Sequence, residues 1–272
     1  MVWGSDGSHS KDVRGPVPHL ATFITAMAKK LPKVDALDIW YADWKAKTMT
    51  PKALIHLSTF VSVTALNLTR ITFPNVLAFG RLIAAIPNLD TLFAEDVTFK
   101  SPAYNRLAFH PQHSKLRMLC LDGPTIPEIV DFLIDPAEIL RSVPKITIGW
   151  YQPVAVTDLK DRRVKEMLEA SGDSLENISF WLDGLHAVDT AAAFDHIAAN
   201  VDQLSHNTNL KILRLGLHIR QTTPLDGTTP ACTWLPDLLS RVASKKLTLI
   251  QLWFNYGGGG ADGELRQRCT QD

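Results

Sequence analysis

Two histidines, His110 and His113, have the spacing at which neighbouring imidazoles on one helical turn can bind a metal ion. Pro111 lies between them, and a proline at this place favours a turn over a helix. The sequence offers no third ligand close by. We therefore expect no metal site in this segment.

The glycine-rich run YGGGGADGE has the G-x-G-x-x-G spacing at Gly258, Gly260 and Gly263. In a dinucleotide site such glycines let the backbone approach a pyrophosphate. A helix, a second strand and an acidic residue about twenty positions on complete that site. Here Asp272 is reached soon after Gly263. We expect residues 257–272 to form a flexible tail that binds no cofactor.

Paired carboxylates, the groups that general acid–base catalysis needs, occur at Asp35 and Asp38 and again at Glu95 and Asp96. The same spacing suits a solvated strand face or a turn. We prefer this second interpretation.

The overall composition excludes several classes of protein. The chain of 272 residues is 46% apolar and 21% charged, which is ordinary for a folded domain. Its 28 basic and 28 acidic side chains cancel, so no net field attracts nucleic acid or an anionic membrane. Cys120, Cys232 and Cys269 lie far apart, which predicts no disulfide framework and favours a reducing compartment. There is no signal-peptide core and no run of about 18 apolar residues, so we expect a cytoplasmic or nuclear protein.

Residues 75–100, NVLAFGRLIAAIPNLDTLFAEDVTFK, contain a predicted helix and a predicted strand. Asn75 can cap a helix whose apolar side chains recur at three- and four-residue spacing, and Pro87 ends it. The following Leu89, Leu92 and Ala94 match the strand signature of a leucine-rich repeat. Such a unit buries its apolar side only when neighbouring units stack on it.

This apolar triplet recurs along the chain in eight places, and its middle residues are separated by 29, 26, 27, 27, 32, 35 and 37 positions. These middle residues are Leu37, Leu66, Leu92, Leu119, Ile146, Ile178, Leu213 and Ile250. Helices are predicted in the intervals, over residues 51–60, 75–86, 102–109, 127–134, 158–170, 191–204 and 235–243.

The alternation predicts an α/β fold, a leucine-rich-repeat solenoid of about eight repeats over residues 18–256. A curved parallel sheet would line its inside and helices its outside. Residues 1–17 are expected to be a flexible leader, because they contain few apolar groups. A doubly wound open sheet is the competing architecture.

The stretch ITFPNVLAFGRLIAAIPNLDTLFAEDVTF has Phe73 and Pro74 before its helix and closes on Val97 and Phe99. It resembles the leucine-rich region of the large fungal F-box-like protein families. The resemblance covers residues 20–255 and is specific mainly over residues 66–99. It implies that the repeats hold a substrate for ubiquitylation, while an amino-terminal F-box docks to the Skp1 adaptor. Residues 16–31, PVPHLATFITAMAKKL, lack the L-P-x-E motif that opens an F-box and are predicted to form the helix of the first repeat.

Side chains alternate across a strand, so residues next to the last two apolar positions of a triplet should face the inside of the curve. This set comprises Asp38, Trp40, Asn67, Thr69, Phe93, Glu95, Cys120, Asp122, Ser179, Trp181, Arg214, Gln251 and Trp253. Tryptophan and arginine are the residue types that anchor protein interfaces. We therefore predict a protein-binding surface made of Trp40, Phe93, Glu95, Trp181, Arg214 and Trp253. The alternative is that loops or tails cover these rings.

The leading functional hypothesis is a non-catalytic protein–protein interaction module. The resemblance extends it to the substrate-recognition part of an F-box-type ubiquitin ligase receptor. A hydrolase-like enzyme is a second hypothesis, with a site in the long loops after repeats five to seven that uses Asp183, His186 and His218. A third is a degenerate fragment without independent function, because neither end offers the polar cap that a solenoid needs.

Overall fold

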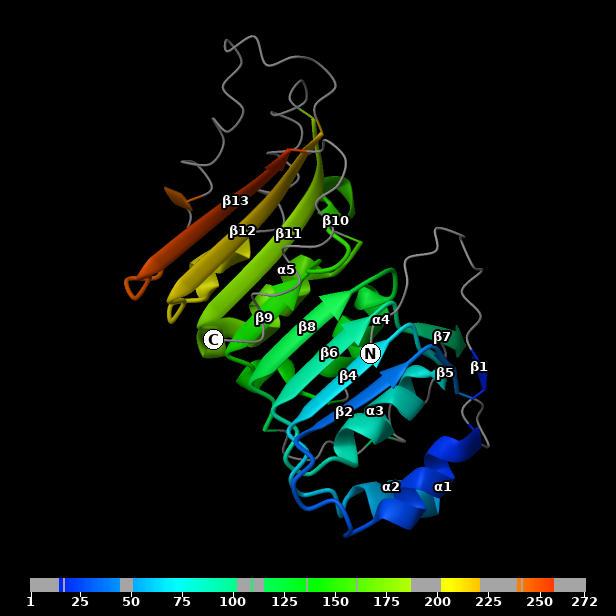
Figure 1. Cartoon of the computed structure of the whole chain (residues 1–272). Helices are drawn as coiled ribbons and strands as arrows, with labels where there is room; N and C mark the ends of the chain where they lie inside the picture. The colour runs from blue at the N-terminus through cyan, green and yellow to red at the C-terminus, as the bar shows by residue number, and fades with distance from the viewer. Residues whose placement is uncertain are drawn as a thin grey trace.

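The computed structural model describes residues 15–16, 18–44, 51–101, 109, 115–135, 137–159, 161–186, 202–220, 239–240 and 242–256. Its centre is a nine-stranded sheet in which every described strand pair is parallel, and helices line one face of this sheet (Figure 1). The chain thus has an α/β fold with a large parallel sheet. Among the described residues, each helix is too short or too polar to span a lipid bilayer.

The strands of the large sheet follow one another across it in chain order. They are β2 (Ala36–Trp40), β4 (Ala65–Thr69), β6 (Thr91–Glu95), β8 (Met118–Asp122), β9 (Lys145–Ile148), β11 (Asn177–His186), β12 (Ile212–Arg220) and β13 (Leu249–Tyr256), with β10 (Val154–Ala155) beside β11. A doubly wound sheet reverses its strand order at one point. The described strands contain no such reversal, so the competing architecture does not apply to them.

The predicted register of the apolar triplets is confirmed. Leu37 pairs with Leu66, and the middle residues of the later triplets continue as cross-strand partners as far as Ile250. The inner six of these side chains are 0% exposed: Leu66, Leu92, Leu119, Ile146, Ile178 and Leu213. The triplets therefore form one continuous core beneath the sheet.

A second, four-stranded parallel sheet includes the short segments that follow β2, β4 and β6. It consists of β1 (Gly15–Pro16), β3 (Ala42–Asp43), β5 (Thr72–Asn75) and β7 (Thr98–Ser101). Gly15 and Pro16, which belong to the predicted leader, pair with Ala42 and Asp43. Residues 1–14 and 17 lie outside the described part of the chain, as does the predicted tail.

A left-handed residue separates the strands of the two sheets. Tyr41, Arg70 and Asp96 follow β2, β4 and β6 with φ of 54°, 56° and 48°. Their amide groups donate to the carbonyl groups of Thr69, Glu95 and Asp122 on the next strand, at 3.0, 2.8 and 3.1 Å. Gly123 follows β8 and Gly149 follows β9, with φ of 100° and 77°. A residue with positive φ thus follows each of five consecutive strands of the large sheet.

The described helices are α1 (Pro18–Met27), α2 (Pro51–Leu57), α3 (Val76–Ala84), α4 (Ile126–Ile134) and α5 (Val164–Ser171), with 3-10 turns at Leu140–Ser142, Val156–Asp158, Gly172–Ser174 and Asp202–His206. Asn75 caps α3 as predicted, because its Oδ1 accepts from the amide of Ala78 at 2.9 Å. The helix predicted from residue 158 begins only at Val164, since Arg163 is left-handed with φ of 58°. Most of the helices predicted over 102–109, 191–204 and 235–243 falls outside the described residues.

Aromatic rings fill the core between α3, α4 and the short sheet. Phe73 lies 5.1 Å from Trp44 and 5.7 Å from Phe79 between ring centroids, and Phe79 lies 6.3 Å from Phe132. A Cβ at Gly80 would lie 2.1 Å from the Phe132 ring, so glycine lets α3 and α4 approach each other. This tight packing fixes the helices against one face of the large sheet. The opposite face of that sheet is therefore the candidate location for a binding site.

Candidate partner-binding face

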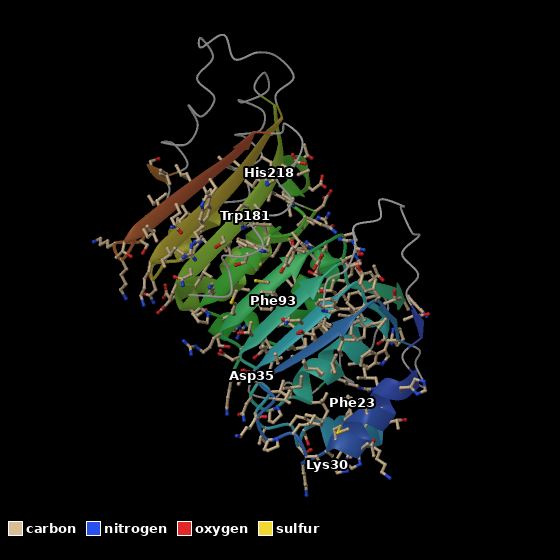
Figure 2. The ribbon with its side chains drawn as sticks, in the orientation of Figure 1. Phe23, Lys30, Asp35, Phe93, Trp181 and His218 are labelled. Atoms are coloured by element: carbon tan, nitrogen blue, oxygen red, sulfur yellow. The ribbon has the colours of Figure 1, made fainter. Side chains whose placement is uncertain are left out.

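The face of the large sheet opposite the helices, called the front face here, carries two rows of cross-strand neighbours. One row, at the middle of the strands, is Asp38, Asn67, Phe93, Cys120 and Thr147, continuing with Ser179, Arg214 and Gln251. The other row is nearer the carboxyl ends of the strands. It contains Trp40, Thr69, Glu95 and Asp122, and further along Trp181, Gly216 and Trp253. Figure 2 labels Phe93 on β6 and Trp181 on β11.

Exposure varies strongly along the front face. Trp40, on the outermost strand, is 62% exposed, whereas Trp181 is only 5% exposed. Phe93, Glu95, Arg214 and Trp253 are partly buried. The six predicted binding residues therefore lie on one face, and the ring of Trp181 is covered there by neighbouring side chains.

Three tryptophans pack together around Trp181. Its ring stacks on Trp253 at 5.2 Å with an interplanar angle of 16°, and it meets Trp150 edge-on at 4.7 Å and 90°. A Cβ at Gly216 would lie 2.1 Å from Cε3 of Trp181, so the glycine makes room for the ring. The buried Nε1 of Trp181 has no acceptor among the described residues.

Trp150 and Gly216 were missed by reasoning from the sequence. Trp150 follows β9 just outside the triplet, so the strand alternation did not include it. Gly216 has no side chain that would signal a site. Its position opposite both Trp181 and Trp253 becomes informative once the register is known.

Arg214 extends the front face beyond the tryptophans. Its Nε donates to Oε1 of Gln251 on the neighbouring strand at 2.7 Å, which holds the guanidinium in place across β12 and β13. A guanidinium has five N–H donors, so this contact leaves donors for a carboxylate or carbonyl of a partner.

Asp122 is a buried carboxyl group beside Glu95 on the front face. The amide groups of Tyr151 and Gln152 donate to its Oδ1 at 3.0 and 3.3 Å. The pKa of Asp122 is raised from 3.8 to about 7, mainly by burial; the two amide bonds lower this pKa and the charge of Glu95 raises it. Because Asp122 is 4% exposed, it presents little surface to a substrate despite a pKa suited to acid–base chemistry.

The other sequence candidates form no site in the described residues. Asp35 and Asp38 are exposed, and Asp38 accepts from Nδ2 of Asn67. His218 lies on β12 and is partly buried (Figure 2). His110, His113 and the glycine run lie outside the described ranges, as does the side chain of His186. No group of three or more histidine, cysteine, aspartate or glutamate side chains in the described part of the chain is arranged to hold a metal ion.

Comparisons with known proteins give no family for this chain. No family model matches it, and no curated protein matches it. A solved structure, the arginine decarboxylase of Paramecium bursaria Chlorella virus bound to agmatine, matches with 13% identity and a TM-score of 0.28. The match covers 88% of this chain and 62% of that chain. A TM-score this low does not establish a common fold, so the chemistry of that enzyme is not transferred.

Proposed function

We propose that the chain is a leucine-rich-repeat protein whose parallel strands line the concave side of a curved solenoid. The support is the lateral alignment of all eight apolar triplets in chain order. Recurrence of a residue with positive φ after five consecutive strands adds to it. Neighbouring strands lie about 4.8 Å apart, so eight of them make a surface about 35 Å long.

The proposed activity is non-catalytic binding of a protein partner on the front face. The observation that carries it is the alignment of Trp40, Phe93, Arg214 and Trp253 on that one face. An exposed tryptophan and a guanidinium with free donors are the groups that anchor interfaces. Trp181 supports the surface from below by holding Trp253 in a stacked position.

The resemblance to fungal F-box-like proteins suggests which kind of partner this is. On that basis the partner is a substrate for ubiquitylation, and the chain is the substrate-recognition part of a ligase receptor. Residues 18–27 form α1, which packs against α2. Residues 16–31 lack the L-P-x-E motif of an F-box, so binding to a Skp1-type adaptor is a separate question. The experiment below answers it independently.

The test is affinity capture from a cell lysate followed by mass spectrometry, with three forms of the chain in parallel. These are the wild type, a Trp40→Ala/Trp253→Ala variant and an Ile55→Ala control. Ile55 is a 67% exposed side chain on α2, so its truncation removes apolar surface from the helical side. We expect proteins retained by the wild type and the control to be lost at least tenfold with the double variant.

Two results would contradict the proposal. Identical captured sets from all three forms would show that the front face is not the binding surface. If the Trp40→Ala/Trp253→Ala variant loses its captured proteins and its thermal stability also collapses, these rings only support the core. Trp40→Ala alone resolves this case, because a 62% exposed ring contributes little to the core. Recovery of the adaptor with every form would support a ligase receptor.

A further inference from the structure

Arg214 is a partly buried cation on the front face, and no carboxylate among the described residues pairs with it. Its Nε donates to Oε1 of Gln251, which is a neutral amide. The remaining N–H donors of the guanidinium stay available. Removing a charge from water without a compensating partner costs free energy, so a guanidinium in this position is suited to a ligand of opposite charge.

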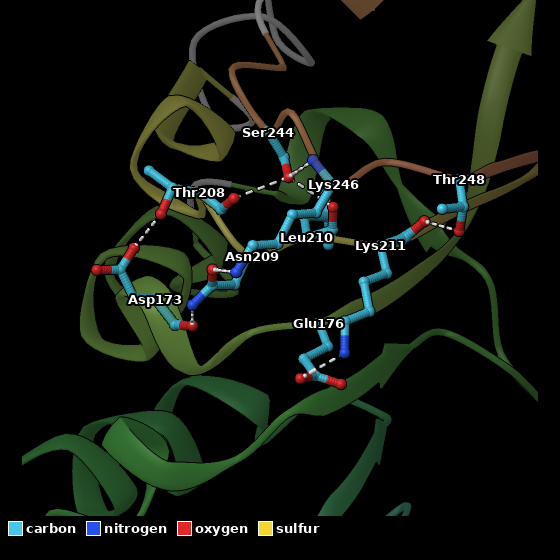
Figure 3. Close-up of polar contacts among 9 residues, drawn as sticks. All are labelled: Asp173, Glu176, Thr208, Asn209, Leu210, Lys211, Ser244, Lys246 and Thr248. Carbon is cyan, nitrogen blue, oxygen red and sulfur yellow. Dashed lines mark hydrogen bonds and ion pairs between the residues drawn. The ribbon is translucent and has the colours of Figure 1, made fainter.

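Lys211, which precedes β12, shows the contrast with Arg214. Its Nζ lies 2.8 Å from Oε1 of Glu176, so the neighbouring unit provides a counter-ion at the amino ends of the strands (Figure 3). Arg214 lies in the middle of β12, and its cross-strand neighbours Ser179 and Gln251 are uncharged. The charge of Arg214 is therefore not balanced by the strands beside it.

Two hydroxyl groups lie in the same row as Arg214. Thr147, Ser179 and Arg214 are successive cross-strand neighbours on β9, β11 and β12. Thr147 and Ser179 are each 5% exposed, and neither hydroxyl makes a hydrogen bond within the part of the chain that the structure describes. Buried hydroxyl groups ordinarily have a partner. The row therefore offers both O–H and N–H donors to an acceptor that a bound protein brings.

The charges around Arg214 favour a carboxylate over a neutral acceptor. Lys145, at the start of β9, is a second partly buried basic side chain on the front face, and it makes no ion pair with any described residue. On the front face of β9, β11, β12 and β13, the described residues include one carboxyl group, Asp183. Asp183 lies four residues beyond Ser179 on β11, or about 13 Å along the strand. This part of the face is therefore basic and complements an acidic ligand.

Aromatic rings lie beside Arg214 toward the carboxyl ends of the strands. The ring of Trp181 lies next to Gly216, two residues after Arg214, since a Cβ at Gly216 would be 2.1 Å from its Cε3. Trp253 stacks on Trp181 at 5.2 Å between ring centroids. Rings beside a charge reduce its contact with water, and a charge-assisted hydrogen bond is stronger there than in open solvent.

We propose that the protein partner binds through an extended segment whose aspartate or glutamate side chain accepts from the guanidinium of Arg214 and the hydroxyl of Ser179. This assignment rests on the proposed function, because it gives the chemistry of one contact on the same face. The fork of Arg214 suits two parallel N–H···O bonds to one carboxylate. Arg214 lies between Trp40 and Trp253 across the sheet, so a segment that contacts both rings passes it at an interior position. The carboxylate is therefore a side chain and not a chain terminus.

The test is selection from a displayed library of random peptides on the immobilised full chain. Peptides of about twelve residues span about 40 Å when extended, which is enough to cross the front face. Arg214→Glu is compared with Lys245→Glu, which makes the same change in net charge at an exposed position before β13. We expect wild type and Lys245→Glu to retain peptides enriched in aspartate and glutamate. Arg214→Glu should retain peptides enriched in lysine and arginine instead.

One retained acidic peptide then gives the size of the contact. Changing its aspartate or glutamate to the corresponding amide should weaken binding to wild type at least about tenfold, because a bidentate charged pair is lost. The same change should not weaken binding to Arg214→Glu. If circular dichroism shows that Arg214→Glu is misfolded, Arg214→Gln replaces it and should bind the acidic peptide and its amide equally.

The Trp40→Ala/Trp253→Ala variant separates this contact from the proposed function. If the retained peptides need both tryptophans but are not acidic, or are acidic whichever residue is at position 214, the carboxylate contact alone is overturned. Peptides that bind the double tryptophan variant as tightly as wild type would overturn the front face as the binding surface. A selection that retains no peptide would also overturn the carboxylate contact, and lysate capture would then decide the proposed function.

Discussion

Asp122 shows how the environment of one residue links the front face to pH. Its carboxyl group is held by two backbone amides yet has its pKa raised to about 7, mainly because burial disfavours the charged form. Below pH 3.8 the folded and unfolded chains both carry the proton. Between pH 3.8 and about 7 the unfolded chain loses it while the folded chain keeps it, so stability falls as pH rises.

The first prediction at this scale concerns Asp122→Asn. Wild type should lose on the order of 3 kcal/mol of unfolding free energy between pH 5 and pH 8, and the variant should lose much less. Asparagine keeps the oxygen that accepts from Tyr151 and Gln152. Urea unfolding at both pH values measures the difference. Asp161→Asn, at an exposed position, should behave as wild type; an equally steep loss in Asp122→Asn would refute the raised pKa.

Residue types alone indicated which side chains share the front face, but not how exposed they are. Trp40 and Trp181 occupy equivalent positions on their strands, but Trp40 is 62% exposed and Trp181 is 5% exposed. The difference arises from Trp150, which arrives from a turn, and from Gly216, which leaves space beside the ring. Neither contribution follows from strand alternation, because both depend on contacts between segments far apart in the sequence.

The turn after each strand is the element that connects the two sheets. Gly123 has φ of 100°, a conformation that side-chain-bearing residues rarely adopt. A Cβ there would also lie 2.9 Å from Cα of Asp96 in the preceding turn. The stacking of turns on one another thus makes glycine necessary at this place, whereas Tyr41, Arg70 and Asp96 tolerate the milder left-handed region.

Gly123→Ala should therefore destabilise the protein by about 1–3 kcal/mol, through backbone strain and the clash together. Gly172→Ala is the matched control, because φ there is 47° and no atom lies within 4 Å of the added Cβ. With ψ of −132° it carries backbone strain of its own but no clash, so it should destabilise the protein less than Gly123→Ala does. Thermal unfolding of both variants separates the contribution of backbone strain from that of the clash with Asp96. Equal effects would mean that the turns do not pack as closely as described.

At the scale of elements, prediction from the sequence succeeded where periodicity and capping residues coincide. Asn75 and the apolar spacing after it located α3, and the triplets located every strand of the large sheet apart from β10. It failed for the short strands β3, β5 and β7, because two to four residues carry no recognisable period. It also placed the start of α5 too early, because nothing in DLKDRRVK announces the left-handed Arg163.

The whole molecule is held together by contacts between units that follow one another in the chain. Each described strand of the large sheet pairs with its neighbours in sequence order, so no pairing joins the two ends directly. Stability in such an arrangement is a sum over units and the interfaces between them. The order of the strands could be predicted from the recurring triplet. The exposure of Ile250 on the last strand could not, because it depends on which side chains pack beside that strand.

Hydrogen exchange should report this gradient. We expect amides of β8, β9 and β11 to exchange most slowly and those of β2 and β13 to exchange at least about a hundredfold faster, because end units open without disturbing the centre. Mass spectrometry of deuterated peptides makes the measurement. Uniform protection along all strands would show that the sheet opens as a single cooperative unit.

The stack of Trp181 on Trp253 also gives the protein an optical property of its own. Two indole rings 5.2 Å apart and 16° from parallel are close enough for their electronic transitions to couple. Such coupling produces a paired signal of opposite signs in ultraviolet circular dichroism. Because Trp253 lies on the front face, this signal is an intrinsic spectroscopic probe of that face and needs no attached dye.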